Sequence, residues 1–248
     1  MSVKIKHIII LFLVSFVVHS CKRRHGDERR IVNTPKIEVE TKKNKASTGN
    51  TQVKELPSTI ITHSQKNLSE HFEILEKSVF MVFSVFENGN SSQGSGFFIS
   101  PNIGVTNYHV IEGAEQIFIN IGDYVYEITE ILKYSPTNQF DYVIFRTTFR
   151  NKTYLKIADK SSKIGEEVFA IGSPQGLKNS LTKGTISGFR GNQRIQIDAT
   201  IDHGSSGGPL FNMNGEVIGV TSSGIGTGSE LNFAVDIQAI PFKNYINK

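Results

Sequence analysis

From Val79 onward, short runs of apolar and β-branched residues are broken every few positions by Asn, Gly, Pro or Asp. The first half of this region contains the runs VFMVFSVF, GSGFFIS, IGVTNYHVI, EQIFINI, YVYEITEIL and DYVIFRT. Short apolar runs with turn residues between them are typical of antiparallel sandwiches and barrels. The pattern therefore predicts an all-β fold.

The second half repeats this style, with the runs EEVFAIG, SLTKGTISGF, RIQIDATI, GPLFN, GEVIGVTSS and LNFAVDI. Asn214-Gly215 stands between two of these runs, and this dipeptide is a strong signal for a two-stranded hairpin. We expect two all-β halves of similar size that join near residues 150–160.

Helical patterns are confined to the two ends of this region. The stretch SEHFEILEKS places Phe72 and Leu75 on one face, and Ser69 is the predicted N-cap. A helical C-terminus is compatible with DIQAIPFKNYINK, although Pro241 keeps it short.

The first 66 residues have a different character. Lys4 and Lys6 precede an apolar run from Ile8 to Val18, which is too short for a comfortable membrane span and suits a signal peptide over residues 1–21. Residues 22–66 are polar and charged without a sustained period, which predicts a disordered tether. The folded domain is expected at residues 67–248.

Charge is distributed unevenly between these segments. The formal net charge is +4, of which residues 1–21 contribute +2 and residues 22–45 contribute +5, which leaves 4 − 2 − 5 = −3 for residues 46–248. The folded part is therefore mildly acidic, and we expect no nucleic-acid partner. The basic cluster after Cys21 is a solvated spacer or a contact for anionic lipid headgroups.

The most informative stretch is IDHGSSGGPL, from Ile201 to Leu210. A serine nucleophile needs a nearby base and backbone donors for the oxyanion that forms on its substrate. Gly204 can adopt a φ that turns its N–H inward beside that of Ser206, so these two residues are the predicted oxyanion donors and Ser206 the predicted nucleophile. The alternatives are Ser205 as the nucleophile and a flexible linker without chemistry.

A base and an acid complete the pattern. His109 ends an apolar run, whereas His203 lies too close to Ser206 along the chain and is expected at the rim of the cleft. Asp141 directly precedes the apolar run YVIF, where a buried carboxylate needs a partner such as an imidazole N–H. The other candidate acids are Asp123, Asp159, Asp198 and Asp202, and Asp198 could instead brace the loop below Ser206.

Cofactor chemistry has no motif in this chain. No metal-ligand cluster or phosphate-cradling loop is apparent, so we expect no metal and no cofactor. The glycine-rich residues 222–230 do not open a helix and are interpreted as a hairpin or a pocket edge. The single cysteine, Cys21, excludes an intramolecular disulfide.

The segments that carry this chemistry resemble the trypsin-like serine proteases of the chymotrypsin fold, in the HtrA/Deg branch. They are GSGFFIS, VTNYHVIEGA, FDYVIFR, AIGSPQGL with GTISG, IDATIDHGSSGGPLFNMNGEVIGVTSS and LNFAVDI. The resemblance implies two six-stranded antiparallel β-barrels, at about 78–150 and 160–240, with the active site between them. It also implies that His109 deprotonates Ser206, that Asp141 orients His109, and that the substrates are polypeptides.

Two features depart from the family pattern. Digestive relatives carry Asp before the catalytic serine, but this chain has Ser205 there, so activation by a newly cut N-terminus is not expected. HtrA/Deg proteins usually add PDZ domains, whereas this chain is expected to lack one because it ends at Lys248, and its oligomeric state stays open.

The specificity pocket is expected to be lined by residues before the nucleophile and on the following strands. These candidates are Thr200, Ile201, His203, Val220, Thr221 and Phe233. None of the side chains expected to form its walls carries a fixed charge, which favours small or medium aliphatic residues before the scissile bond.

Residues Val18–Cys21 resemble a bacterial lipoprotein cleavage box, which implies lipidation of Cys21 and a membrane anchor. Together these features predict a serine endopeptidase tethered in the bacterial cell envelope, facing the periplasm, for protein processing or quality control. For the N-terminus, the alternatives are an ordinary signal peptide and an uncleaved anchor in which Cys21 has no role. For the activity, they are a catalytically weak binding module with the same fold and an esterase.

Overall fold

The computed structural model describes residues 67–173, 179–191, 193–222 and 231–246. The predicted signal peptide, the predicted tether and Cys21 lie outside the described residues. Within the described part of the chain, no helix is long and apolar enough to cross a membrane.

The described chain opens with helix α1 (Leu68–Leu75), followed by a 3-10 turn, η1 (Glu76–Ser78). Its N-cap is Asn67, whose side chain accepts a hydrogen bond from the Glu70 N–H at 2.9 Å, so the prediction of Ser69 was wrong. Asn67 has extended backbone angles while its side-chain oxygen reaches the open first turn, which is the geometry that an N-cap requires. Phe72 and Leu75 pack against the core, as expected from their shared face.

The first half forms a seven-stranded antiparallel sheet with the order β5-β4-β1-β2-β3-β7-β6. Its strands are β1 (Val79–Val85), β2 (Ser91–Ser100), β3 (Ile103–Thr106), β4 (Gln116–Ile121), β5 (Tyr124–Glu127), β6 (Glu130–Ser135) and β7 (Tyr142–Arg146). The two edge strands, β5 and β6, follow one another closely in the chain, so the sheet must curl to bring its edges near each other. This half is a curled seven-stranded sheet, in place of the six-stranded barrel that was expected.

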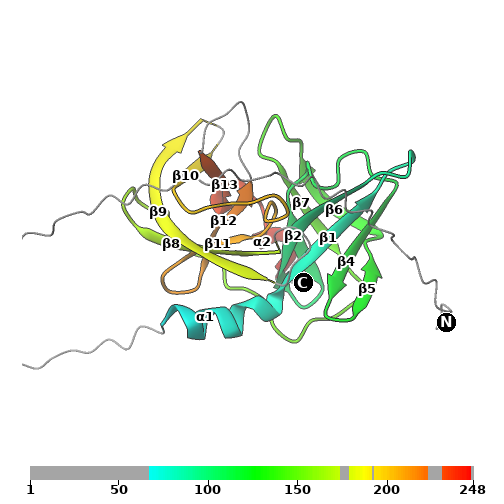
Figure 1. The fold of residues 1–248 in the computed structure, drawn as a ribbon, viewed down its shortest axis with the longest axis horizontal. Coiled ribbons are helices and arrows are strands. Elements are labelled where there is room, and N and C mark those ends of the chain that lie inside the picture. Colours follow the sequence, from blue (N-terminus) through cyan, green and yellow to red (C-terminus); the bar gives the residue numbers. More distant parts are fainter. Residues whose placement is uncertain (1–66, 174–178, 192, 223–230, 247–248) are drawn as a thin grey trace, which may run out of the picture. The chain divides into compact units, whose positions relative to one another are not determined.

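The second half is a closed six-stranded barrel with the order β10-β13-β12-β11-β8-β9 (Figure 1), as predicted. Its strands are β8 (Glu167–Gly172), β9 (Ser180–Arg190), β10 (Arg194–Ile197), β11 (Pro209–Asn212), β12 (Val217–Ser222) and β13 (Asn232–Asp236). The predicted hairpin at Asn214-Gly215 joins β11 to β12, and Gly215 has a φ of 76°. The all-β class is confirmed.

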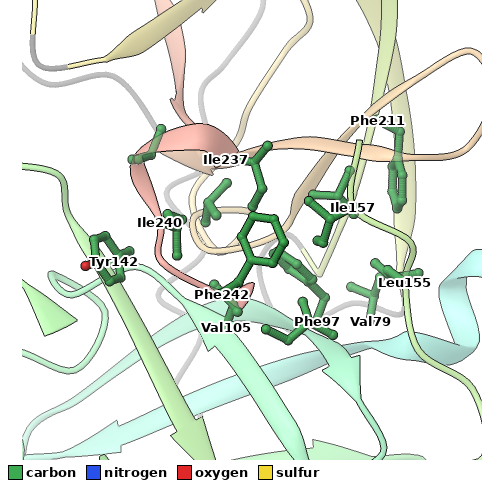
Figure 2. Packing of buried hydrophobic residues seen from close by; sticks show 14 of the residues in the cluster. Val79, Phe97, Val105, Tyr142, Leu155, Ile157, Phe211, Ile237, Ile240 and Phe242 are labelled. Atoms are coloured by element: carbon green, nitrogen blue, oxygen red, sulfur yellow. The ribbon is translucent and has the colours of Figure 1, made fainter. Parts of the chain in front are cut away.

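Each half has its own apolar core, and a third cluster joins the two halves. That cluster combines Phe97 of β2, Phe211 of β11 and Ile157 of the connection between the halves with the last described residues (Figure 2). The chain ends in a 3-10 turn, η3 (Ile237–Ala239), and in helix α2 (Lys243–Ile246). Ile240 and Phe242 are buried between the two halves, which fixes the halves against each other.

Candidate active site

Strand pairing brings His109 and Asp141 together. Strands β3 and β7 are antiparallel, with Thr106 at the end of β3 opposite Val143 near the start of β7. Residues that follow β3 therefore meet residues that precede β7. The Nδ1 atom of His109 lies 2.8 Å from Asp141 Oδ2, and the His109 backbone N–H donates to Asp141 Oδ1 at 3.0 Å.

The Asp141 carboxylate is buried, with 2% of the side chain exposed, whereas 32% of the His109 side chain is exposed. The Thr137 hydroxyl lies 3.4 Å from Asp141 Oδ1. A buried carboxylate with such partners is tolerated because its charge is satisfied by donors. The carboxylate also favours the proton on Nδ1 of His109, which leaves Nε2 with a lone pair that can accept a proton.

Asp141 itself has an unusual backbone, with a φ of 48°. A non-glycine residue in this left-handed region is strained and needs support from its surroundings. Asn107 supplies it by donating its side-chain amide to the Asp141 carbonyl at 2.8 Å. The oxygen of that amide, Asn107 Oδ1, is buried without a partner among the described residues.

Ser206 lies on two successive tight turns, here called the Ser206 loop (residues 202–208). The Ser205 N–H donates to the Asp202 carbonyl at 3.0 Å, and the Gly208 N–H donates to the Ser205 carbonyl at 3.1 Å. The third residue of each turn is a glycine with positive φ, 95° at Gly204 and 89° at Gly207. This is the pattern of a type II turn, which requires glycine at that position. Backbone geometry thus explains Gly204 and Gly207 of GSSGG.

The Ser206 loop belongs to the second half of the chain but contacts the sheet that carries His109. The Ser95 N–H of β2 donates to the Ser206 carbonyl at 2.7 Å. A Cβ atom on Gly94 would lie 2.6 Å from Val110 Cγ1 and 3.0 Å from the Ser206 carbonyl oxygen. Gly94 therefore lies between Val110, which follows His109, and the backbone of Ser206. The segment of His109 and the Ser206 loop approach each other at this glycine.

The other candidate acids have different surroundings. Asp198 accepts hydrogen bonds from the backbone N–H and the hydroxyl of Thr185, which together lower its pKa, so it braces strand β9. The Asp202 carbonyl closes the first turn of the Ser206 loop, and Asp123 lines a surface cavity beside β1 and β4. Asp159 lines another surface cavity, beside Lys156. Of all the candidate acids, Asp141 is the one whose side chain is described in contact with His109.

The predicted specificity residues do not all face one space. Thr200, Ile201 and Thr221 line a cavity of about 140 Å³ beside Ser205. Val220 is fully buried in the core between the two halves, so its inclusion was wrong. Neighbouring residues of a strand point to opposite faces, so Thr221 lines the cavity while Val220 packs into the core.

His203 and Phe233 lie outside this cavity. His203 is exposed on the Ser206 loop, and Phe233 is half-buried on β13 opposite Ser222. Residues 223–230 of the predicted pocket-edge loop lie outside the described residues. Within the described residues, no group of His, Cys, Asp and Glu side chains could hold a metal ion.

Sequence reasoning missed Asn107, Ser95 and Thr137. Asn107 and Ser95 have fully buried polar side chains in segments that otherwise read as strands, and a buried polar side chain must find a partner. The signal was present in TNYH and GSGFF, but the identity of the partners depends on which strands pair.

Comparison with known proteins shows the family to which this fold belongs. Residues 94–220 match the family model described as the trypsin-like peptidase domain. A probable periplasmic serine endoprotease DegP-like from Pseudomonas putida is 37% identical over 171 residues, which are 63% of this chain and 35% of that protein. The anti-sigma-I factor RsgI9 from Acetivibrio thermocellus is 36% identical over 164 residues, 63% of this chain and 23% of that protein. The chain thus spans about a quarter to a third of the length of these relatives.

Two solved structures have the same fold. The active form of the Rv3671c protease from M. tuberculosis gives a TM-score of 0.61 with 26% identity, over 67% of this chain and 78% of that chain. The serine endoprotease from Yersinia pestis gives a TM-score of 0.59 with 27% identity, over 70% of this chain and 63% of that chain. By its matched segment and its two-part β fold, the chain belongs to the trypsin-like peptidase domain family.

Proposed function

We propose that the protein is a serine endopeptidase in which His109, Asp141 and Ser206 form the catalytic triad. The observation that carries this proposal is the His109–Asp141 pair, in which both carboxylate oxygens receive an N–H of the same histidine. This pair belongs to the sheet that contacts the Ser206 loop through Ser95. The arrangement has the base, its orienting acid and the alcohol that acyl transfer requires.

In the proposed reaction, Ser206 Oγ attacks the carbonyl carbon of the scissile peptide bond while its proton passes to His109 Nε2. Collapse of the tetrahedral intermediate breaks the C–N bond, and the amine leaves with that proton. Water then attacks the acyl-enzyme, gives a proton to His109, and the acid product leaves as Ser206 regains its proton. Asp141 holds the imidazole in the required tautomer throughout and stabilises its charged form.

The oxyanion of the intermediate would be bound by the N–H groups of Gly204 and Ser206. The positive φ of Gly204 supports this role, because it is the left-handed conformation that glycine adopts readily and that the oxyanion role was expected to need. Ser206 itself is 4% exposed, so its amide lies in surroundings of low dielectric, where a hydrogen bond to a developing charge is strong.

For substrate preference, we propose small or medium aliphatic residues before the scissile bond. The cavity beside Ser205 is small, and Thr200, Ile201 and Thr221 line it with uncharged side chains. Asp202, the charged residue of the lining, is exposed to solvent. A peptide library with every residue at that position would report this preference. Strong selection for Arg or Lys would overturn it.

For location, we propose a lipid anchor at Cys21 and a place in the bacterial cell envelope, facing the periplasm. The support is the signal-like sequence before Cys21 and the description of the relatives as periplasmic serine endoproteases. Palmitate should label the protein in cells and should not label a Cys21→Ser variant. A wild-type protein without label would contradict the anchor but would leave the endopeptidase proposal intact.

The catalytic proposal is tested by covalent labelling and by turnover of casein. A fluorophosphonate should label the wild type and a Ser205→Ala variant, and should not label Ser206→Ala. Casein should be cut by the same two proteins that are labelled. Labelling that persists in Ser206→Ala would exclude Ser206 as the nucleophile. Folded wild-type protein that takes no label would favour a binding module.

A further inference from the structure

Ser95 is a fully buried residue of β2 whose hydrogen bonds reach three separate segments. Its N–H donates to the Ser206 carbonyl at 2.7 Å, and its hydroxyl donates to the Gly204 carbonyl at 2.7 Å. The same hydroxyl accepts the Ser173 N–H at 2.9 Å, and the Ser95 carbonyl accepts the Thr106 hydroxyl at 2.7 Å. The first two bonds join the sheet of His109 to the Ser206 loop.

These two bonds hold the peptide units on either side of the Ser206 amide. In the unit that joins Gly204 to Ser205, the carbonyl is bound by Ser95 and the N–H by the Asp202 carbonyl at 3.0 Å. In the unit that joins Ser206 to Gly207, the carbonyl is bound by Ser95 and the N–H by the Thr221 carbonyl at 2.7 Å. Because a peptide unit is planar, contacts at both ends prevent its rotation. The Ser206 N–H belongs to the peptide unit between these two, so its direction is fixed from both sides, and Gly204 is held on the side of its carbonyl.

The Ser95 hydroxyl can play this part only in one orientation. It has a single proton, and its oxygen already accepts the Ser173 N–H, so the proton is directed to the Gly204 carbonyl. Ser173 follows strand β8 of the second half, and its own carbonyl accepts from the side chain of Gln93, also on β2, at 2.9 Å. The orientation of the hydroxyl is therefore set from the opposite half of the molecule.

The space around Ser95 admits little else. A Cβ atom on Gly207 would collide with the Ser95 carbonyl oxygen and the Thr106 hydroxyl, and one on Gly208 would lie 3.4 Å from Ser95 Cβ. The loop and the strand thus approach as closely as glycine permits. Position 95 therefore requires a side chain that is small enough for this space and that carries a strong donor for the Gly204 carbonyl.

We infer that Ser95 is a positioning residue that holds the Ser206 loop with its oxyanion donors turned toward the substrate. This inference rests on the proposed function. Ser95 does not touch the substrate, and it acts through the carbonyls of Gly204 and Ser206. Its hydroxyl should contribute to binding of the transition state much more than to binding of the ground state.

Three variants test the inference. Ser95→Ala removes the hydroxyl, and Ser95→Cys keeps nearly the same volume with a weak donor. Ser78→Ala is the matched control, because Ser78 is also buried (2% exposed) and its hydroxyl bonds Thr153 at 3.0 Å, away from the loop. All measurements are made well below the melting temperature of each variant, so that the folded fractions are equal.

We expect kcat for a peptide substrate to fall about tenfold or more in Ser95→Ala and Ser95→Cys, short of the roughly 10²–10³-fold loss for an oxyanion donor itself. KM should stay within about threefold, since ground-state binding is retained. The affinity for a peptide boronate, which mimics the tetrahedral intermediate, should fall in parallel with kcat. The pH midpoint of kcat/KM, which reports His109, should not move, and Ser78→Ala should keep the wild-type kcat.

Wild-type kcat and boronate affinity in Ser95→Cys would mean that Ser95 only fills space, and would overturn the inference. Failure of the proposed function gives a different result, namely a wild type that no fluorophosphonate labels. In that case hydrogen exchange of the amides of residues 204–206 decides the positioning role alone. Faster exchange in Ser95→Ala than in the wild type supports the role, and unchanged exchange contradicts it.

Discussion

Asn107 donates its side-chain amide to the carbonyl of Asp141, whose φ of 48° places the backbone in the left-handed region. The bond joins the residue after β3 to the residue before β7, and Asn107 is fully buried. It therefore stabilises a strained backbone at the position from which the carboxylate reaches both N–H groups of His109.

We predict that Asn107→Ala lowers the free energy of unfolding by about 1–3 kcal/mol, because a buried carbonyl loses its donor. The activity should fall as well, since the Asp141 backbone gains freedom. Asn151→Ala is a suitable control, because Asn151 makes a comparable bond, 2.9 Å to the Lys77 carbonyl, at an exposed position. Urea unfolding and kcat measured side by side will separate the two effects. Equal activity of Asn107→Ala and the wild type would contradict a role for this bond in the site.

Asp141→Asn should preserve the fold and lower kcat by about 10⁴-fold, because an amide beside Nδ1 favours the wrong tautomer of His109. Steady-state kinetics on a peptide substrate, with circular dichroism to verify folding, will measure this. Asp198→Asn should leave kcat unchanged, since Asp198 bonds Thr185 on β9. A larger loss in Asp198→Asn than in Asp141→Asn would reverse our assignment of the acid.

Gly207→Ala should disrupt the Ser206 loop, because φ is 89° there and the new Cβ would strike the Ser95 carbonyl and the Thr106 hydroxyl. We expect loss of fluorophosphonate labelling and a lower melting temperature. Gly89→Ala provides the comparison, because its φ of 79° is similar but nothing lies within 4 Å of the added atom. It should cost only about 1–2 kcal/mol of backbone strain and leave labelling intact. Similar labelling of the two variants would argue against the close contact between the halves.

The hairpin of β11 and β12 should lose stability in acid because of Glu216. The pKa of the Glu216 carboxyl is lowered, chiefly by the hydrogen bond that it accepts from Lys156 and next by the one that it accepts from Asn212. A carboxyl with a lowered pKa stabilises the folded state above its unfolded pKa of about 4.3, and this contribution is lost as the pH falls through the folded pKa. Glu216→Gln should therefore show a flatter decline of unfolding free energy below about pH 4.3 than the wild type. If the unfolding free energies of Glu216→Gln and the wild type declined with the same slope, Glu216 would not be the source of this acid sensitivity.

Asp236 should behave in the opposite sense, which makes it the internal control for this measurement. Burial raises its pKa, although its carboxylate accepts the Gln238 N–H at 2.9 Å. The folded state then loses stability as the pH rises from the unfolded pKa through the raised one. Asp236→Asn should remove that loss, so that the variant gains stability relative to the wild type as the pH rises through this range.

Periodicity and residue type were sufficient to predict the all-β class, the hairpin at Asn214-Gly215 and the glycines of the Ser206 loop, because these features depend on neighbours within a few residues. His109, Asp141 and Ser206 could also be proposed from the chain alone, since each residue type has a chemistry that few positions can accommodate. The residues that surround and support them could not be predicted in this way. Val220 was assigned to a pocket because alternation along a strand does not tell which face meets the core, and Ser69 was chosen over Asn67 because both can cap a helix.

The roles of Asn107 and Ser95 emerge only from tertiary structure. Their side chains bond carbonyls that are 34 and 109 positions away along the chain. Such contacts depend on the register of β3 against β7 and on the packing of one half against the other. A hydrogen bond acts over about 3 Å, so no local pattern specifies which distant carbonyl a buried amide or hydroxyl will meet.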